Sequence, residues 1–288
     1  MFNKIYGQKE LITNIENLLR EDKLPQTIIM SGDRKSGKTL FSEYIAYCIG
    51  IPYINISNID EVRLMIEECY TSRFEKVYII EDFNLLNFRA KEAMLKILEE
   101  PPQNSYIVLN TYNDSFLKDT IKNRCYIFNI DNYKLVDLQL YESAANKNNH
   151  TILEENGLYE VFNSIGWLMY INENNRLSDY LKFIGKFLRI INTTNGGDAL
   201  KSLEYISVKK DDDKIDFLLF LKLLYIEIVK SMKIDKINLI PILDLITKTK
   251  NKLIINRYLS IDVVYSNFII DYRYWSKKIG FARIETQY

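Results

Sequence analysis

Apolar residues in the first 130 positions follow two different spacings. Continuous apolar runs are typical of strands buried on both faces, whereas apolar residues three or four positions apart are typical of amphipathic helices. Strands are predicted at 27–30, 51–56, 76–82, 106–111 and 126–130, and helices at 10–20, 40–46, 59–68 and 88–100. This alternation predicts a three-layer α/β domain built on a parallel sheet.

Beyond residue 130 the pattern becomes almost entirely helical. Residues 131–175 are predicted to form a small helical lid, and residues 176–288 an all-α domain. Within the latter, helical spacing predicts helices at 177–191, 199–206, 217–232, 239–246 and 259–275. The run at 217–224 is apolar on nearly every side, which indicates a buried helix, and the charged run at 209–214 indicates a solvated loop. We therefore expect three domains, with the α/β domain at 1–130.

A glycine-rich segment lies between the first buried strand and the helix that follows it. It has the pattern of a glycine, four free positions and then Gly-Lys-Thr. Its glycines allow the backbone to curl so that successive N–H groups face one point, and the next helix adds its positive end. Lys38 is predicted to reach the β- and γ-phosphates of ATP, and the Thr39 hydroxyl to hold Mg²⁺. The full predicted nucleotide-binding set is Gly32, Lys35, Ser36, Gly37, Lys38 and Thr39. The alternative is an ordinary glycine turn capped by a helix.

Two acidic residues, Glu81 and Asp82, end the strand predicted at 76–82. The carboxyl ends of parallel strands meet at one edge of the sheet, so these side chains are expected beside the glycine loop. There Glu81, with Thr39, would hold Mg²⁺ through water, and the acidic pair would polarise the water that attacks the γ-phosphate. The alternative is a strand that simply ends in solvent.

Composition narrows the possible functions. Lys+Arg and Asp+Glu both total 38, so attraction of the whole chain to nucleic acid is not expected, although a local basic face is compatible with this balance. Three cysteines without paired spacing argue against a disulfide framework and a zinc site, and one histidine leaves no material for a histidine triad. No signal peptide or membrane-spanning run is evident, so we expect a cytoplasmic protein without membrane association.

Several short motifs occur in a definite order along the first 130 residues. They are Gly7-Gln8, Leu24-Pro25, the glycine loop, Asp60 with Arg63, Glu81-Asp82, Leu98-Glu99-Glu100-Pro101 and Arg124-Cys125. In this order they resemble the clamp-loader branch of the AAA+ ATPases, first the delta-prime subunits of bacterial DNA polymerase III and next the tau/gamma subunits. The resemblance implies a AAA+ nucleotide-binding domain, a lid and a helical collar that joins subunits.

The resemblance also implies partners and cofactors. The chain would bind ATP and Mg²⁺ within a hetero-oligomer of clamp-loader subunits, a pentamer, that opens a sliding clamp and places it on primer–template DNA. Asn110 or Thr111 would be the sensor-1 group near the γ-phosphate, and Arg124 would be an arginine finger for a neighbouring subunit, with a surface ion pair as its alternative. The residues expected to follow the DNA backbone, or else to be solvated surface, are Arg89, Lys91, Lys118 and Lys122.

The sequence departs from this family pattern at four places. Residues 50–58 replace a cysteine zinc module, Glu81-Asp82 reverses the Asp-Glu order of the tau/gamma type, Asn123 replaces a serine, and Trp167 occupies the position of a lid arginine. ATP hydrolysis is therefore left open, and a hydrolysis-poor stator that donates Arg124 is one alternative. Others are a AAA+ helicase loader or initiator, and a structural assembly protein with a vestigial glycine loop.

Overall fold

The computed structural model describes residues 5–145, 153, 158–174, 181–188, 213–235, 239–255 and 260–279. The chain divides into two compact units, and each is described by itself. The first contains Met1–Glu155 and Phe162–Tyr170, and the second contains Asn156–Val161 and Ile171–Tyr288. The division between the units thus falls inside the segment predicted as a lid.

The first unit is built on a parallel sheet of five strands in the order β2-β3-β4-β1-β5. The strands are β1 (Thr27–Ser31), β2 (Tyr53–Ile56), β3 (Lys76–Ile80), β4 (Ser105–Thr111) and β5 (Tyr126–Asn129). All five predicted strands are confirmed, with ends that differ by at most two residues. In register, Met30 lies beside Asn110 and Ser31 beside Thr111. The end of β4 therefore lies next to the start of the glycine loop.

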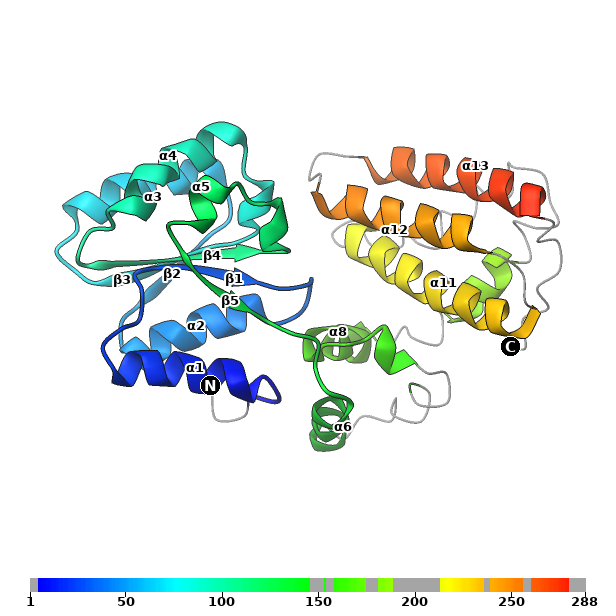
Figure 1. Cartoon of the computed structure of the whole chain (residues 1–288), viewed down its shortest axis with the longest axis horizontal. Helices are drawn as coiled ribbons and strands as arrows, with labels where there is room; N and C mark the ends of the chain where they lie inside the picture. The colour runs from blue at the N-terminus through cyan, green and yellow to red at the C-terminus, as the bar shows by residue number, and fades with distance from the viewer. Residues whose placement is uncertain are drawn as a thin grey trace. The chain divides into compact units, whose positions relative to one another are not determined.

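Helices cover both faces of this sheet. Helices α1 and α2 lie on one face, and α3, α4 and α5 lie on the other (Figure 1). Their bounds are α1 (Lys9–Arg20), α2 (Lys38–Ile49), α3 (Ile59–Thr71), α4 (Phe88–Glu99) and α5 (Asp119–Lys122). Short 3-10 helices occupy Phe83–Leu85 and Asp114–Phe116 in this unit, and Leu158–Glu160 in the second unit. The three layers predicted from the alternating pattern are confirmed.

Local capping explains where several of these helices begin. Helix α2 starts at Lys38, two positions earlier than predicted, because its N-cap Gly37 adopts a φ of 102° that turns the chain directly into the helix. Asn58 and Asn87 cap α3 and α4, and each accepts a hydrogen bond of 2.9 Å from a backbone N–H three residues later. Lys38 and Thr39 consequently belong to the first helical turn.

The core of the first unit fills the spaces between the sheet and its helices. One cluster joins Ile80 of β3 and Leu109 of β4, both fully buried, to Met94, Ile97 and Leu98 on one side of α4. Burial on this scale fixes the register of strand and helix, because a one-residue slip would turn the apolar side chains toward solvent. The carboxyl edge of the sheet is thereby held in place.

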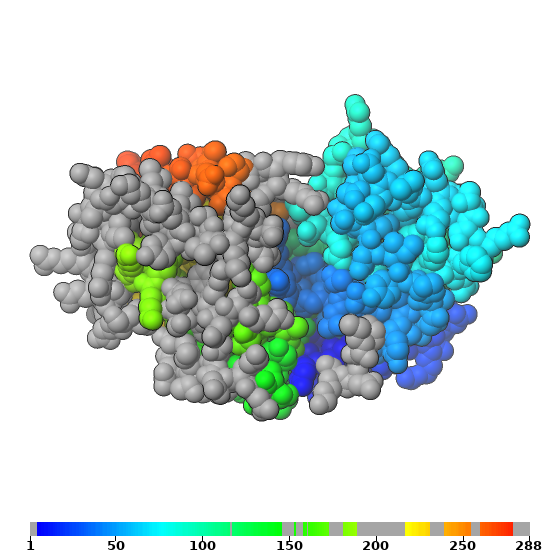
Figure 2. All heavy atoms as spheres, turned by 180° about the vertical axis from the view of Figure 1, so that it is seen from behind, coloured from blue at the N-terminus to red at the C-terminus, as the bar shows by residue number. Residues whose placement is uncertain are grey.

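Two helices of the predicted lid lie in the described residues: α6 (Leu135–Ala144) and α8 (Ile165–Asn174). In Figure 2, the described residues of the first unit before the lid are coloured from blue through cyan to green. Among the described residues, no helix combines the length and apolar character required to cross a bilayer.

The second unit is helical throughout its described residues. Its main helices are α11 (Asp213–Asp235), α12 (Ile240–Ile255) and α13 (Ile261–Ile279). Phe217, Phe220 and Leu224 are fully buried, which confirms the prediction of a buried helix at 217–224. Aromatic rings dominate this core, with Phe217 5.3 Å from Tyr265 between ring centroids.

Two predictions for the second unit need correction. The prediction of a loop at 209–214 is wrong at its C-terminal end, because α11 already begins at Asp213. Helix α12 continues past the predicted end at residue 246, since the Thr247 and Thr249 hydroxyls donate to carbonyls one turn earlier at 2.9 and 2.8 Å and do not interrupt the helix. Of the helix predicted at 177–191, residues 181–188 are helical; the remainder, and the helix predicted at 199–206, lie outside the described residues.

Candidate functional site

The glycine loop connects β1 to α2 and is tightly curved. Lys35 and Gly37 have φ values of 61° and 102°, in the left-handed region. A Cβ atom at Gly32 would lie 2.7 Å from the Ser36 Oγ and 3.1 Å from the Ile130 Cβ, so a side chain at this position would displace its neighbours. This curve is the arrangement that directs successive backbone N–H groups toward one point.

The Lys38 side chain folds back over this loop. Its Nζ donates to the carbonyl oxygens of Gly32 and Asp33 at 3.0 and 2.8 Å. Burial lowers the pKa of Lys38, while the nearby carboxylates of Asp82, Asp33 and Glu81 oppose that shift. The cation is thus held at the mouth of the loop, where an anionic group could take over its hydrogen bonds.

Three elements bring polar groups together on one oxygen atom of Glu81. The Thr39 Oγ1, from α2, donates to the Glu81 Oε1 at 2.8 Å, and the Asn110 Nδ2, from the end of β4, donates to the same oxygen at 3.1 Å. Burial raises the pKa of Glu81, and these two hydrogen bonds act in the opposite direction. A carboxylate beside a hydroxyl is a donor set that suits Mg²⁺, so these residues fit the metal that the sequence predicted.

Ser42 extends this network, and the sequence reasoning missed it. The Ser42 hydroxyl lies 2.7 Å from the Asn110 Oδ1 and 2.9 Å from the Lys38 carbonyl oxygen. Its position four residues after Lys38, on the same side of α2, was the available signal. Asn110 is fully buried, and both ends of its amide are hydrogen-bonded, the Nδ2 to Glu81 and the Oδ1 to Ser42.

The other two predicted residues at this edge are arranged differently. Asp82 is exposed and has a φ of 45°, as the N-cap of a 3-10 helix. The Thr111 hydroxyl donates to the Asn113 carbonyl oxygen at 3.4 Å, within its own strand end. Of the two candidates for a sensor group, Asn110 therefore contacts the acidic edge, and Thr111 does not.

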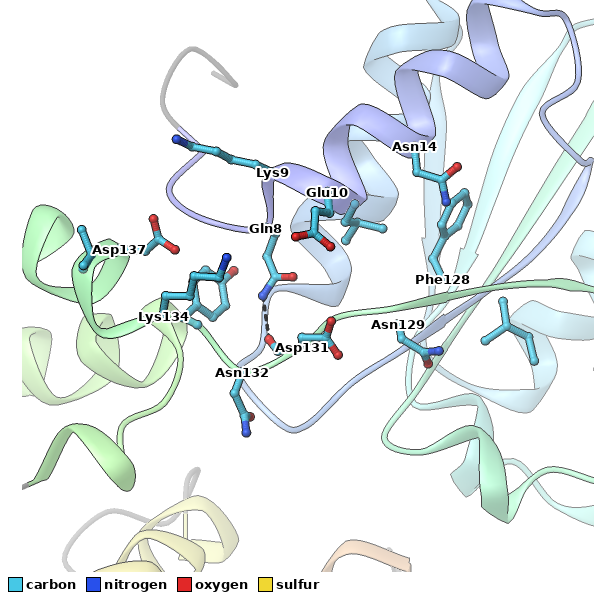
Figure 3. A pocket seen from close by; sticks show the side chains of 14 residues that line it. Gln8, Lys9, Glu10, Asn14, Phe128, Asn129, Asp131, Asn132, Lys134 and Asp137 are labelled. Carbon is cyan, nitrogen blue, oxygen red and sulfur yellow. Dashed lines mark hydrogen bonds between the residues drawn. The ribbon is translucent and has the colours of Figure 1, made fainter.

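A cavity of about 420 Å³ lies between the start of α1, strand β5 and the segment that leads into α6 (Figure 3). The Gln8 Nε2 donates across it to the Asp131 carbonyl oxygen at 2.6 Å. Tyr133 lines this cavity and donates through its hydroxyl to the Ser36 carbonyl oxygen at 3.0 Å. Burial raises the pKa of Tyr133 to about 12, so this hydroxyl remains a donor at neutral pH. Lys38, Thr39 and Glu81 are absent from the cavity lining.

Arg124 forms an ion pair within its own chain. Its Nη2 and Nε atoms lie 3.0 and 3.2 Å from the Glu99 Oε2, and its Nη1 donates to the Thr120 carbonyl oxygen. The Arg124 carbonyl oxygen accepts a hydrogen bond of 2.7 Å from Thr27, which fixes the backbone to β1. The structure thus shows the ion pair that was the alternative to an arginine finger, on a side chain that is 29% exposed.

The four basic residues predicted to follow DNA do not all face outward. The Lys91 ammonium donates to the Asn84 carbonyl oxygen at 2.7 Å, and burial lowers the pKa of Lys91. Lys122 pairs with Asp119 at 2.7 Å. Arg89 and Lys118 are exposed, and the Lys118 Nζ lies 4.1 Å from the centroid of the Phe88 ring. Arg89 and Lys118 are therefore the two that face outward.

The parallel sheet, the glycine loop after its first strand and the acids after β3 define the first unit as an α/β domain with a P-loop. The fold as a whole is similar to a variant of Thermotoga maritima RuvB, with a TM-score of 0.50 and 14% identity over 97% of this chain and 90% of that one. A family model described as DNA polymerase III, delta subunit, matches residues 52–134.

Sequence similarity to curated proteins indicates the kind of protein more specifically than similarity of fold does. The DNA polymerase III subunit gamma of Buchnera aphidicola subsp. Schizaphis graminum is 26% identical over 239 residues, which cover 71% of this chain and 58% of the relative. The tau subunit of Bacillus subtilis is 24% identical over 269 residues, covering 74% and 47%. This chain is thus similar to the gamma, tau and delta-type subunits of DNA polymerase III. It spans about half the length of these curated relatives.

Proposed function

We propose that this protein is a clamp-loader subunit that binds ATP and Mg²⁺ and helps to open a sliding clamp and load it on primed DNA during replication. The observation that carries the proposal is the convergence of Lys38, Thr39 and Glu81 at one edge of the sheet, with Thr39 and Glu81 joined at 2.8 Å. A polyphosphate with a divalent cation uses all three groups at once.

Each residue has a role that follows from its contacts. Lys38 would exchange the carbonyl oxygens of the loop for phosphate oxygens, because its donors already converge at the mouth of the loop. Thr39 and Glu81 would hold Mg²⁺, which when bound neutralises charge on the phosphates. Asp82 would orient the attacking water, and Asn110 would hold the Glu81 carboxylate in place.

Titration of the purified chain with a fluorescent ATP analogue, with and without Mg²⁺, tests this proposal. Lys38→Ala should weaken binding at least tenfold, because a charge-assisted contact to phosphate is removed. Lys23→Ala, which alters a lysine paired with Glu21 at 2.9 Å outside the site, should bind like the wild type. Unchanged binding by Lys38→Ala would favour a structural assembly protein with a vestigial loop.

The subunit type is part of the proposal as well. Relatives include gamma and tau subunits, and also a delta-prime subunit of Buchnera aphidicola that is 29% identical over 79 residues. We place the chain in a hetero-oligomer, a pentamer, with other clamp-loader subunits, in contact with a sliding clamp and primer–template DNA. The helical second unit would act as the collar that joins neighbouring subunits.

One observation favours a hydrolysis-poor stator of the delta-prime type. The longer acid, Glu81, is the one that contacts Thr39, so the shorter and exposed Asp82 is left for the attacking water. A one-carbon difference at that position lowers the efficiency of a positioned base. In this role the chain binds ATP and contributes Arg124 to the site of a neighbour.

Steady-state ATP turnover at increasing chain concentration, with primed DNA, separates these two roles. Turnover that rises with concentration and is lost in Arg124→Ala indicates a self-assembling motor. Near-zero turnover at every concentration indicates a stator that requires other subunits. Arg20→Ala, in the last turn of α1, is the matched control and should not alter turnover.

A further inference from the structure

The first turns of α8 contact the glycine loop at a single loop residue, Lys35. The Ser164 Oγ donates to the Lys35 carbonyl oxygen at 2.8 Å. A Cβ atom built on Gly166 would lie 2.3 Å from the same oxygen and 3.2 Å from the Lys35 Cα, so the two backbones touch. The Lys35 ammonium lies 4.7 Å from the centroid of the Tyr170 ring. The main chain of Lys35 is thus contacted by Ser164 and Gly166, and the end of its side chain is contacted by Tyr170.

Lys35 is also the loop residue with the least favourable backbone. Its φ of 61° is in the left-handed region, which a residue with a Cβ atom rarely adopts. Such a conformation persists only where the surroundings hold it in place. The surroundings here are Ser164 at the carbonyl group and Gly166 at the Cα atom.

The next loop residue is held from the same side. The Ser36 carbonyl oxygen accepts from the Tyr133 hydroxyl at 3.0 Å, and the Tyr133 backbone N–H donates to the Asn163 carbonyl oxygen at 3.0 Å. Two successive loop carbonyls are thus bound by residues outside the loop.

An independent observation indicates that a ligand completes this loop. The Ser36 side chain is only 4% exposed, and its hydroxyl has no hydrogen-bond partner in the structure. The Ser36 hydroxyl lies 2.7 Å from the position that a Cβ atom at Gly32 would occupy, so it lies close to the first residue of the loop. Buried hydroxyl groups are normally paired, and a phosphate oxygen would satisfy this one.

We propose that Ser164 and Gly166 are positioning residues of the phosphate site. They hold Lys35 in its left-handed conformation, so that the loop has its binding shape before a polyphosphate arrives. The inference rests on the proposed function of the loop. Trp167 is 1% exposed and carries no charge, so this part of α8 influences the phosphates through the main chain of the loop and makes no ionic contact with them.

A double-mutant cycle tests the inference, with the Mg²⁺ complex of a fluorescent ATP analogue as the probe. Ser164→Ala should weaken binding by about five- to tenfold, as expected for one lost hydrogen bond that shapes the site. Lys35→Gly is the second background of the cycle, because glycine adopts a positive φ without strain and does not require the contact from Ser164 to hold that conformation. In the Lys35→Gly background, Ser164→Ala should cost less than about twofold.

Two further variants keep the result interpretable if Ser164→Ala folds poorly. Ser143→Ala removes an equivalent hydrogen bond, 2.8 Å from the Ser143 Oγ to the Gln139 carbonyl oxygen on α6, and should not change the affinity. In a Trp275→Phe background, Trp167 is the single tryptophan, since the chain has two. Gly166→Ala should then make Trp167 more accessible to acrylamide quenching without nucleotide, because the added methyl group separates α8 from Lys35.

The outcomes separate the inference from the function on which it rests. If the wild type binds the ATP analogue and both Ser164→Ala and Gly166→Ala bind it equally tightly, the inference is overturned and the proposed function is left intact. Equal losses from Ser164→Ala in both backgrounds show that Ser164 does not act through Lys35, and they also overturn it. A wild-type chain that binds no ATP analogue overturns the proposed function and the inference together.

Discussion

Replacing Glu81 by glutamine should stabilise the free protein at neutral pH. The half-buried carboxylate accepts two hydrogen bonds on one oxygen, at 2.8 Å from Thr39 and 3.1 Å from Asn110, and a glutamine Oε1 can accept both. Burial nevertheless raises the pKa of Glu81, so the folded state holds its ionised form less favourably than the unfolded chain does. The substitution removes that charge and keeps the two acceptor contacts.

The direction in which stability changes with pH follows from the number of protons bound by the folded and unfolded states. Between the ordinary pKa of a glutamate and the raised pKa in the fold, the folded state binds more protons than the unfolded state, so stability falls as pH rises through that interval. Glu81→Gln removes this loss. We expect a gain of about 1 kcal/mol at pH 8, near the low end of the cost of burying a polar group, because partial exposure screens the charge. For a protein of this size, that gain raises Tm by roughly 2–4 °C.

Thermal unfolding of the wild type and Glu81→Gln at pH 5 and pH 8, without Mg²⁺ or nucleotide, measures this effect. The difference in Tm should be small at pH 5 and largest at pH 8. Glu61→Gln is a control of opposite sign, because Glu61 accepts a hydrogen bond of 2.7 Å from the Ser57 N–H and its pKa is lowered. That variant should lose stability at both pH 5 and pH 8, because a carboxylate with a lowered pKa is ionised at both, and the loss should disappear only below the lowered pKa of Glu61.

The reasoning is refuted if Glu81→Gln lowers Tm at pH 8, or if its effect is the same at both pH values. Either result would mean that the ionised carboxylate is not disfavoured by burial. A functional measurement accompanies the thermal one. Glu81→Gln should lose the Mg²⁺ dependence of ATP-analogue binding, because a neutral amide is a poor ligand for Mg²⁺ compared with a carboxylate.

Three further predictions concern separate parts of the first unit. Asn110→Ala should weaken Mg²⁺-dependent binding of the ATP analogue by about tenfold and leave Mg²⁺-free binding unchanged, because its amide donates to Glu81; Ser105→Ala, a buried serine at the other end of β4, is the control. Glu99→Gln should cost less than about 1 kcal/mol in urea unfolding, since the Glu99 side chain is 60% exposed, and a larger loss would contradict a surface ion pair. Ile97→Ala, at a residue 1% exposed, should cost about 3 kcal/mol in the same assay, and a loss below about 1 kcal/mol would contradict close packing of α4 on the sheet.

Local patterns in the sequence determined most of the first unit. Strands β1, β3 and β4 are almost entirely buried, so they appear as apolar runs, and the ends of all five strands were predicted within two residues. The glycine loop could be predicted equally well from the sequence, because its curvature depends on residues that are neighbours in the chain. Even the placement of the acidic pair followed from a general property of parallel strands, whose carboxyl ends share one edge.

Tertiary structure decided which side chains meet at that edge. Asn110 reaches Glu81 because β4 lies between β3 and β1, and the spacing of apolar residues carries no information on strand order. The pairing of Arg124 with Glu99 depends likewise on the contact between α5 and the end of α4.

The contact of Ser164 with Lys35 joins residues 129 positions apart. The sequence by itself determined the elements and the chemistry of the loop, since both follow from interactions between near neighbours. Only the tertiary structure decided how the site is held in shape, because hydrogen bonds and backbone contacts between distant segments form after the elements have packed.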